Sequence, residues 1–311
     1  MSVLFFKPIP KVTIWGTDIV KDYFQYNEFP DNVGQAWAFS GQQGDATICL
    51  SEPYVGKDLY TLWNEHQELF GNKKGEFPVI ISLVGPNDDL SIQVHPDSEY
   101  AKKIGYPMGK NEAWYFLEAP TPSDIVYGHI AKDKEDLQSY IKQEKWMELI
   151  KHLPVKKDDF VYLPAGLLHA LKKDNIVYEI QQATDITYRF FDYHRKDEKG
   201  NERELHLQQA IDCLSYNPEE MKNSIHPKIE NYENLKKTTY IQNDSFTVTK
   251  VDVTGKTKYK DENYQLATVV RGTGRVDNQE VCVGSNFLIP INTEVTFEGN
   301  MVIMMTTKEG V

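Results

Sequence analysis

Two polar residues in a strand-like segment are the first sign of chemistry in this sequence. Residues 90–95 alternate between apolar and polar, so Gln93 and His95 should project from one face of a strand, beside Ser91. Buried without partners, a glutamine and a histidine would each cost about 1–3 kcal/mol. A metal ion held inside the fold would satisfy both side chains.

Two more residues of ligand type stand in other strand-like segments. Glu112 opens the apolar run 112–117, and His169 follows a turn at 163–166 that contains proline and glycine. An amide oxygen, a carboxylate and two imidazoles suit Zn²⁺, with Mn²⁺, Fe²⁺ and Co²⁺ as alternatives. A single histidine in a strand is usually structural, but the four residues together favour a metal site. Because thiolates are missing from the set, an open catalytic site is favoured over a closed structural one.

Short strand-like segments must position these side chains. They lie at 77–84, 90–95, 113–117, 125–130, 160–163, 176–180 and 186–191, with turn-forming clusters at 85–88 and 120–124. This pattern predicts a mainly β protein, built as a sandwich or barrel. Helical periodicity is clearest at 132–152, which we interpret as a helical insertion, and further helices are expected at 57–70 and 205–214.

A polar stretch at 215–237 divides the chain into two predicted units. Residues 1–220 would form the catalytic, metal-binding domain, and residues 238–311 a smaller C-terminal domain. Residues 283–290 weakly echo residues 157–164, because in each a turn leads into an apolar strand that ends at proline. Two related β-barrels in tandem would explain the echo.

The second unit should be free of metal. Counting from the matching prolines, the position equivalent to His169 is Val295, and no histidine or acid pair occupies the equivalent strands. Residues 271–275 contain two glycines between two arginines, but no helix follows them. They therefore indicate a hairpin turn and not a phosphate-binding loop.

Charge and composition exclude several classes of protein. Lys and Arg total 34 and Asp and Glu total 46, which gives a net charge of −12, whereas nucleic-acid binders usually carry a basic face. No apolar run reaches the ~18 residues of a membrane span, and the N-terminal residues lack the pattern of a signal peptide. Cys49, Cys213 and Cys282 lie far apart without a CxxC motif. We predict a cytoplasmic monomer or homodimer that binds neither nucleic acid nor membrane.

The ligand set lies within motifs that resemble a known family. Residues 159–169 read D-x-x-x-x-P-x-G-x-x-H, which is similar to the second motif of the cupin superfamily. The wider sequence resembles a type I mannose-6-phosphate isomerase of the short bacterial form, so both predicted barrels would be cupin-like jelly rolls. The matching segments are 14–16, 34–37, 89–97, 109–115, 187–195 and 200–206.

The resemblance implies a zinc-dependent aldose–ketose isomerase. Such an enzyme interconverts mannose 6-phosphate and fructose 6-phosphate through a cis-enediol, with one zinc ion per chain. The implied zinc ligands are Gln93, His95, Glu112 and His169, the implied catalytic residues are Lys110, Asp185 and Arg189, and the implied phosphate-binding residue is Ser91.

General chemistry suggests roles for these residues. Lys110 and Arg189 could donate hydrogen bonds to substrate oxygens, and arginine suits a bidentate grip on phosphate. Asp185 is either an acid/base group or a partner that holds Arg189. The group that carries the proton stays open among a zinc-bound water, Lys110 and a ligand histidine.

The sequence departs from the family pattern at three positions. Ser82 stands where many members have lysine, Leu167 where threonine is usual, and Gln35 where glutamate is usual. Losing a lysine at position 82 removes a positive charge that would hold phosphate. This leaves two alternatives: a cupin isomerase for another sugar phosphate, or a catalytically silent sugar- or metal-binding cupin with a regulatory role.

Overall fold

The computed structural model describes residues 2–196 and 199–308, which are mainly β. Strands between residues 9 and 191 form two of the sheets. The six-stranded sheet has the order β12 (Phe160–Leu163), β9 (Glu112–Glu118), β14 (Ile176–Gln182), β7 (Val79–Val84), β3 (Val33–Phe39) and β2 (Ile9–Thr17). The five-stranded sheet has the order β11 (Ile150–Val155), β10 (Ser123–His129), β13 (His169–Ala170), β8 (Ile92–Val94) and β15 (Tyr188–Phe191). A separate ribbon joins β4 (Gly41–Gln42) to β5 (Asp45–Ala46).

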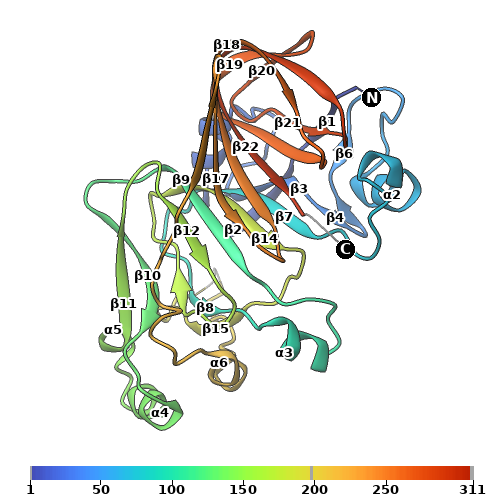
Figure 1. Ribbon diagram of the computed structural model, residues 1–311. Helices are drawn as coiled ribbons and strands as arrows, with labels where there is room; N and C mark the ends of the chain where they lie inside the picture. Colours follow the sequence, from blue (N-terminus) through green and yellow to red (C-terminus); the bar gives the residue numbers. More distant parts are fainter. Residues whose placement is uncertain (1, 197–198, 309–311) are drawn as a thin grey trace.

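The C-terminal half forms a nine-stranded sheet that also recruits strands from the start of the chain. Its order is β16 (Lys228–Tyr232), β17 (Leu235–Gln242), β18 (Thr247–Lys260), β22 (Glu294–Thr307), β19 (Gln265–Val276), β21 (Asn286–Ile289), β1 (Leu4–Lys7) and β6 (Ile48–Cys49), with β20 (Gln279–Cys282) beside β19. One face of this sheet encloses its own apolar core, which includes Val251, Phe287 and Ile303. Strands far apart in the sheet order share this core, so the sheet curls around it (Figure 1).

The six-stranded sheet is buried on both faces, which explains its long apolar runs. Ile81 and Tyr115, on one face, join a core shared with Val248 and Met304 of the nine-stranded sheet. The opposite face carries Trp114, which packs in a second core with residues of the five-stranded sheet. The two N-terminal sheets therefore form a sandwich, and the nine-stranded sheet is a third layer.

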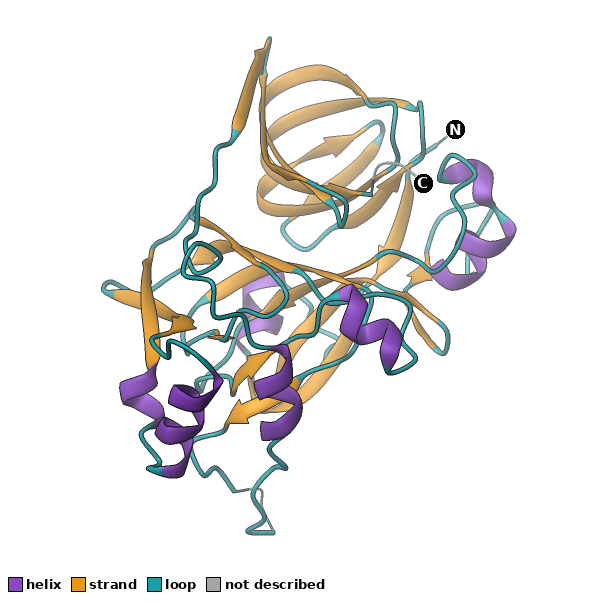
Figure 2. Cartoon of the chain, turned by 60° about the horizontal axis from the view of Figure 1, so that its bottom comes forward, coloured by secondary structure: helices purple, strands orange, loops and turns teal. Residues whose placement is uncertain are grey.

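Helices lie at the periphery, mainly outside the five-stranded sheet (Figure 2). The helices are α1 (Ile19–Phe24), α2 (Leu59–Glu65), the 3-10 turn η1 (Gln67–Leu69), α3 (Ser98–Lys103), α4 (Lys134–Lys142), α5 (Trp146–Leu149) and α6 (Leu207–Cys213). Leu137 of α4 and Ile211 of α6 pack on the outer face of that sheet, against Ile92 and Phe190. None of the helices in the described ranges is both long and apolar enough to cross a membrane.

The mainly β prediction is confirmed, and the tandem closed barrels are not. Within residues 2–196 and 199–308 no sheet closes on itself, because each ends on edge strands. The predicted insertion at 132–152 contains α4 and α5, but its last residues begin the edge strand β11. A domain division between residues 220 and 238 stays a prediction.

The expected hairpin turn at 271–275 is wrong. These residues lie inside β19, and the turn falls at residues 277–278. Gly272 has a φ of +79°, close to a register shift between Val269 and Arg271, so the glycine accommodates a bulge within the strand.

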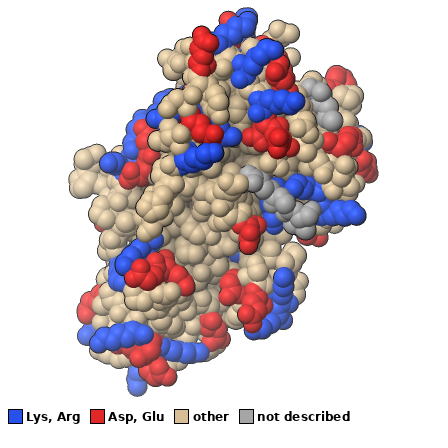
Figure 3. Space-filling view, in the orientation of Figure 1, with Lys and Arg blue, Asp and Glu red and all other residues tan. Residues whose placement is uncertain are grey.

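On the face seen in Figure 3, acidic and basic side chains are interspersed.

Candidate metal centre

Three buried side chains from the two N-terminal sheets meet inside the sandwich. His95 lies one residue past β8, His169 opens β13, and Glu112 opens β9 of the facing sheet. Glu112 Oε1 is 3.3 Å from His95 Nε2, and Glu112 Oε2 is 3.4 Å from His169 Nε2. One ligand atom from each residue lies within 4.8 Å of the others.

Backbone carbonyls orient both imidazoles. His95 Nδ1 donates to the carbonyl of Ile186 at 2.7 Å, and His169 Nδ1 donates to the carbonyl of Leu167 at 2.9 Å. This assigns the proton to Nδ1 and turns the Nε2 lone pair of each ring toward Glu112, as in histidine metal ligands.

The ligand atoms are left without hydrogen bonds. His95 Nε2, His169 Nε2 and Glu112 Oε2 are buried and have no hydrogen-bond partner among the described residues. Three enclosed, unsatisfied acceptors would be costly in a merely structural core. Two imidazole nitrogens and a carboxylate oxygen are a donor set that fits a divalent metal ion.

The protonation states favour metal binding. Burial, together with the nearby Lys110 ammonium, lowers the pKa of His95 to about 4, so the ring is neutral at pH 7. Burial alone would raise the pKa of Glu112, but Lys110 Nζ at 3.0 Å and His95 hold that pKa well below its usual range. The centre therefore offers a neutral imidazole at His95 and an ionised carboxylate at Glu112.

Gln93 and Ser91 lie beside this triad. Gln93 is paired in register with His169 on one side and with Arg189 on the other, so the three side chains share the inner face of the sheet. The Ser91 hydroxyl, which is buried, donates to Gln93 Oε1 at 3.4 Å. The roles of Gln93 as a ligand and Ser91 as a phosphate contact stay predictions.

Arg189 and Asp185, the two other catalytic residues that the resemblance implies, lie in different environments. Arg189 is half-buried and its Nη1 donates to the carbonyl of Glu204 at 2.8 Å, whereas Asp185 is exposed. No ion pair joins the two within the described ranges. Lys110, in contrast, is 5% exposed and directly contacts the Glu112 carboxylate.

Glu179 is a site residue that the sequence interpretation missed. It lies on β14 between Ser82 of β7 and Trp114 of β9, in register with both, and its carboxylate accepts from Trp114 Nε1 at 2.9 Å. Burial and the neighbouring Glu112 carboxylate raise the pKa of Glu179 to about 7. A lone acid in the middle of the apolar run 176–180 was the signal that could have identified it.

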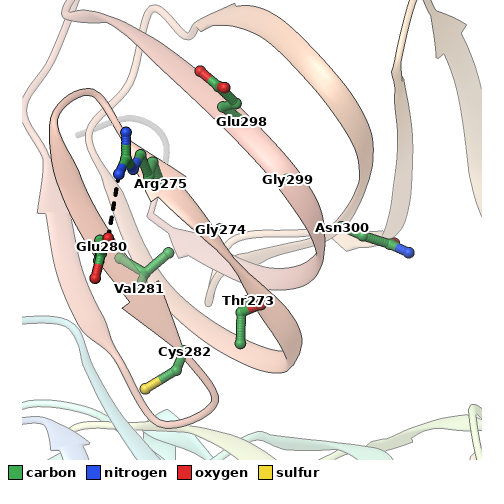
Figure 4. Close-up of a pocket in the computed structure, with 9 residues that line it drawn as sticks. All are labelled: Thr273, Gly274, Arg275, Glu280, Val281, Cys282, Glu298, Gly299 and Asn300. Carbon is green, nitrogen blue, oxygen red and sulfur yellow. Dashed lines mark hydrogen bonds and ion pairs between the residues drawn. The ribbon is translucent and has the colours of Figure 1, made fainter.

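A separate hollow lies on the hairpin of β19 and β20, next to β22 (Figure 4). Its charged residues include Arg275 and Glu280, which pair with each other at 3.2 Å. None of its lining residues belongs to the metal centre, and the paired charges offer no set of ligand atoms comparable to the triad.

Known proteins match this chain along most of its length. Residues 5–124 match the family described as phosphomannose isomerase type I, catalytic domain. Residues 236–308 match the family described as mannose-6-phosphate isomerase, cupin domain.

Individual proteins that are similar to this chain carry the same family name. The mannose-6-phosphate isomerase ManA of Bacillus subtilis is 36% identical over 294 residues, which cover 92% of each chain. The probable mannose-6-phosphate isomerase GmuF of that species is 34% identical over 311 residues, or 97% of this chain and 98% of GmuF. The crystal structure of the mannose 6-phosphate isomerase from Bacillus subtilis has a TM-score of 0.93 at 32% identity, covering 99% of this chain and 100% of that one.

Proposed function

The chain belongs to the type I phosphomannose isomerase family, and from this premise we propose that it interconverts mannose 6-phosphate and fructose 6-phosphate. The observation that carries the proposal is the buried group of His95, Glu112 and His169, whose ligand atoms have no other partner. The family match supplies the substrate, and the triad supplies the chemistry that this reaction needs.

We propose that the triad and Gln93 hold one zinc ion. When bound, the ion supplies a positive charge that stabilises negative charge on the substrate oxygens. Gln93 supports this assignment because it faces the same space as His169 and carries an amide oxygen. Several divalent ions accept these ligands, so the ligand set alone does not select one. The choice of zinc rests on the family resemblance.

The buried Lys110 ammonium would donate a hydrogen bond to a substrate oxygen. It lies beside Glu112, 5% exposed, so its charge acts in a poorly solvated place where electrostatic interactions are strong. Arg189 and Ser91 would hold the phosphate. Asp185 stays a predicted catalytic residue; its exposed carboxylate contributes only if the substrate reaches it.

We assign the transfer of a proton between C1 and C2 to Glu179. Its carboxylate lies on the inner face of the six-stranded sheet. Glu179 is paired in register with Trp114, which stands two residues along β9 from Glu112. Its pKa of about 7 suits a group that must take and return a proton near neutrality. Glu179 removes the proton from C2 of mannose 6-phosphate as O1 gains a proton, which gives the cis-enediol. The same carboxyl then returns its proton to C1 as O2 loses one, which gives fructose 6-phosphate.

Arg189→Lys should raise KM for mannose 6-phosphate about tenfold and change kcat little. Lysine keeps the charge but loses the planar fork that grips phosphate through two bonds, a loss of about 1.4 kcal/mol. Steady-state kinetics measures the effect, with Arg275→Lys on the distant hairpin as the control. An unchanged KM would place the phosphate elsewhere.

The proposed function is tested by supplying mannose 6-phosphate to the zinc-loaded chain and measuring fructose 6-phosphate. We expect turnover, and we expect other aldose 6-phosphates to react more slowly. Faster turnover of another sugar phosphate would favour the alternative prompted by Ser82. Tight sugar binding without turnover would favour a silent binding protein. Cytoplasmic location and a monomeric or homodimeric state stay predictions.

A further inference from the structure

The inner face of the nine-stranded sheet ends in a polar hollow that the isomerase reaction does not use. The hollow has a volume of about 890 Å³ and lies where β17, β18, β22 and β19 run side by side (Figure 1). It shares no residue with the metal centre.

Four strands change from apolar to polar side chains toward this hollow. On β18, for example, Val253 and Val251 belong to the apolar core, and Thr249 and Thr247 follow on the same face. The polar members are Thr239 of β17, Thr247 and Thr249 of β18, Gln265 of β19 and Thr307 of β22. They are adjacent across strands, because Thr239 is paired with Thr249 and Thr247 with Thr307.

Apart from the half-buried Thr239, these polar residues are buried, unlike an ordinary solvent-facing rim. Thr249 and Gln265 are each 4% exposed and Thr307 is 2% exposed. The Thr307 hydroxyl lies near that of Tyr264, but forms no hydrogen bond with any described residue. A buried hydroxyl without a partner is costly, which points to a bonding partner that comes from a ligand.

The charges around the hollow argue against an ionic ligand. Lys237 pairs with Asp261 at 3.4 Å, and Lys228 pairs with Glu230 at 3.3 Å. An anion or a cation would have to break these pairs. Lys260 and Glu262 also line the hollow, so three lysines face three acids and neither charge is in excess. The hydroxyl and amide groups lie among them, together with Tyr232, whose ring is 58% exposed and can cover the apolar face of a sugar ring.

We propose that this hollow is a second binding site, and that it takes a neutral saccharide. Several clustered hydroxyl and amide groups beside one exposed aromatic ring match the mixed hydroxyl and C–H surface of a sugar. Ligand sites are common in the mouths of β-barrels, and the end of this curled sheet has a similar shape. The site is independent of the isomerase activity, so either can fail without the other.

The test is binding of neutral disaccharides (cellobiose, maltose and mannobiose) to the zinc-loaded chain. Saturation-transfer NMR and calorimetry are performed with saturating mannose 6-phosphate, so that sugar phosphate occupies the isomerase site throughout. We expect one-to-one binding of at least one disaccharide. The double variant T249V/T307V should bind it about tenfold more weakly, because it removes two hydroxyls from the lining but keeps their shape. The Thr249 hydroxyl also bonds that of Thr239 at 3.3 Å, so the melting temperature of the double variant is measured beside its binding.

Three single variants separate lost binding from lost folding. Thr254→Val, on the exposed continuation of β18, should bind like the wild type. Thr307→Val should melt no lower than the wild type, because the hydroxyl it removes has no partner. Tyr232→Ala removes an exposed ring and its exposed hydrogen bond to Glu230, so it should fold normally and also weaken binding. Absence of binding, equal binding by T249V/T307V, or binding seen only when mannose 6-phosphate is left out would overturn the proposal.

Discussion

His95→Ala is expected to remove the metal and to lower kcat/KM for mannose 6-phosphate by about 10³-fold or more. Alanine deletes one of the three buried donors and leaves Glu112 and His169 with an incomplete set. A Lewis-acid metal contributes several kcal/mol of charge stabilisation, and each 1.36 kcal/mol corresponds to tenfold in rate. Elemental analysis of the purified variant measures bound metal, and the isomerase assay measures the rate.

His152→Ala is the matched control for this loss. His152 is a half-exposed histidine on β11, paired with Asp124 at 3.5 Å and not part of the triad. The control should retain one metal ion per chain and the wild-type rate. Treating the wild type with a chelator should reproduce the His95→Ala rate, and added Zn²⁺ should restore it. Full metal content in His95→Ala would remove this residue from the ligand set.

Glu179→Gln is expected to lower kcat about 10²–10⁴-fold while metal content and KM stay near wild type. Glutamine has the same shape and still accepts a hydrogen bond from Trp114, but it cannot take up a proton. Glu118→Gln is the control, because Glu118 lies on the neighbouring strand and pairs with Lys157 away from the site. A wild-type kcat in Glu179→Gln would exclude this carboxylate as the proton carrier.

The pH dependence provides a second readout of Glu179. Because the base must be ionised, the rate should rise with pH up to the pKa of Glu179. This pKa is about 7 without a metal ion, and a bound cation lowers it. This limb should be absent in Glu179→Gln.

The stability of the fold should also depend on Glu179. Since the pKa of Glu179 is raised in the folded state, ionisation destabilises the fold as pH rises from about 4.5 to 7. At pH 8 the glutamine variant should therefore melt higher than the wild type, and this difference should vanish below pH 4.5.

The metal triad was accessible from sequence because strand periodicity is a local property. Gln93 and His95 stand two residues apart, so any strand through them places both on one face. Glu112 and His169 stood out as polar residues at the starts of apolar segments. Their common location then followed from the family resemblance, and the structure brings His95, Glu112 and His169 together.

Glu179 could not be placed in the same way. Its role depends on β14 lying between β7 and β9 in a register that sets it beside Ser82 and Trp114. Pairing between distant strands is not written in any local pattern. Asp185 and Arg189 came from the family resemblance and not from a local pattern, and their catalytic roles stay predictions.

The sheet architecture was predictable only in part. Apolar runs such as β7 indicated strands buried on both faces, and this is confirmed. The sequence did not reveal that the first strand leaves the N-terminal half. Leu4 of β1 is paired with Leu288 of β21, so the beginning of the chain lies in the last sheet to be synthesised.

That pairing has a consequence for biosynthesis. While the ribosome is still making the C-terminal third, Leu4–Lys7 has β6 on one side and nothing on the other. One edge of β1 stays without a partner strand until β21 has been synthesised. The last pairing of this sheet therefore joins segments near the two ends of the polypeptide, and pairings between such distant segments form slowly. A nascent or shortened chain that lacks β21 would expose a strand edge, the surface through which β proteins aggregate.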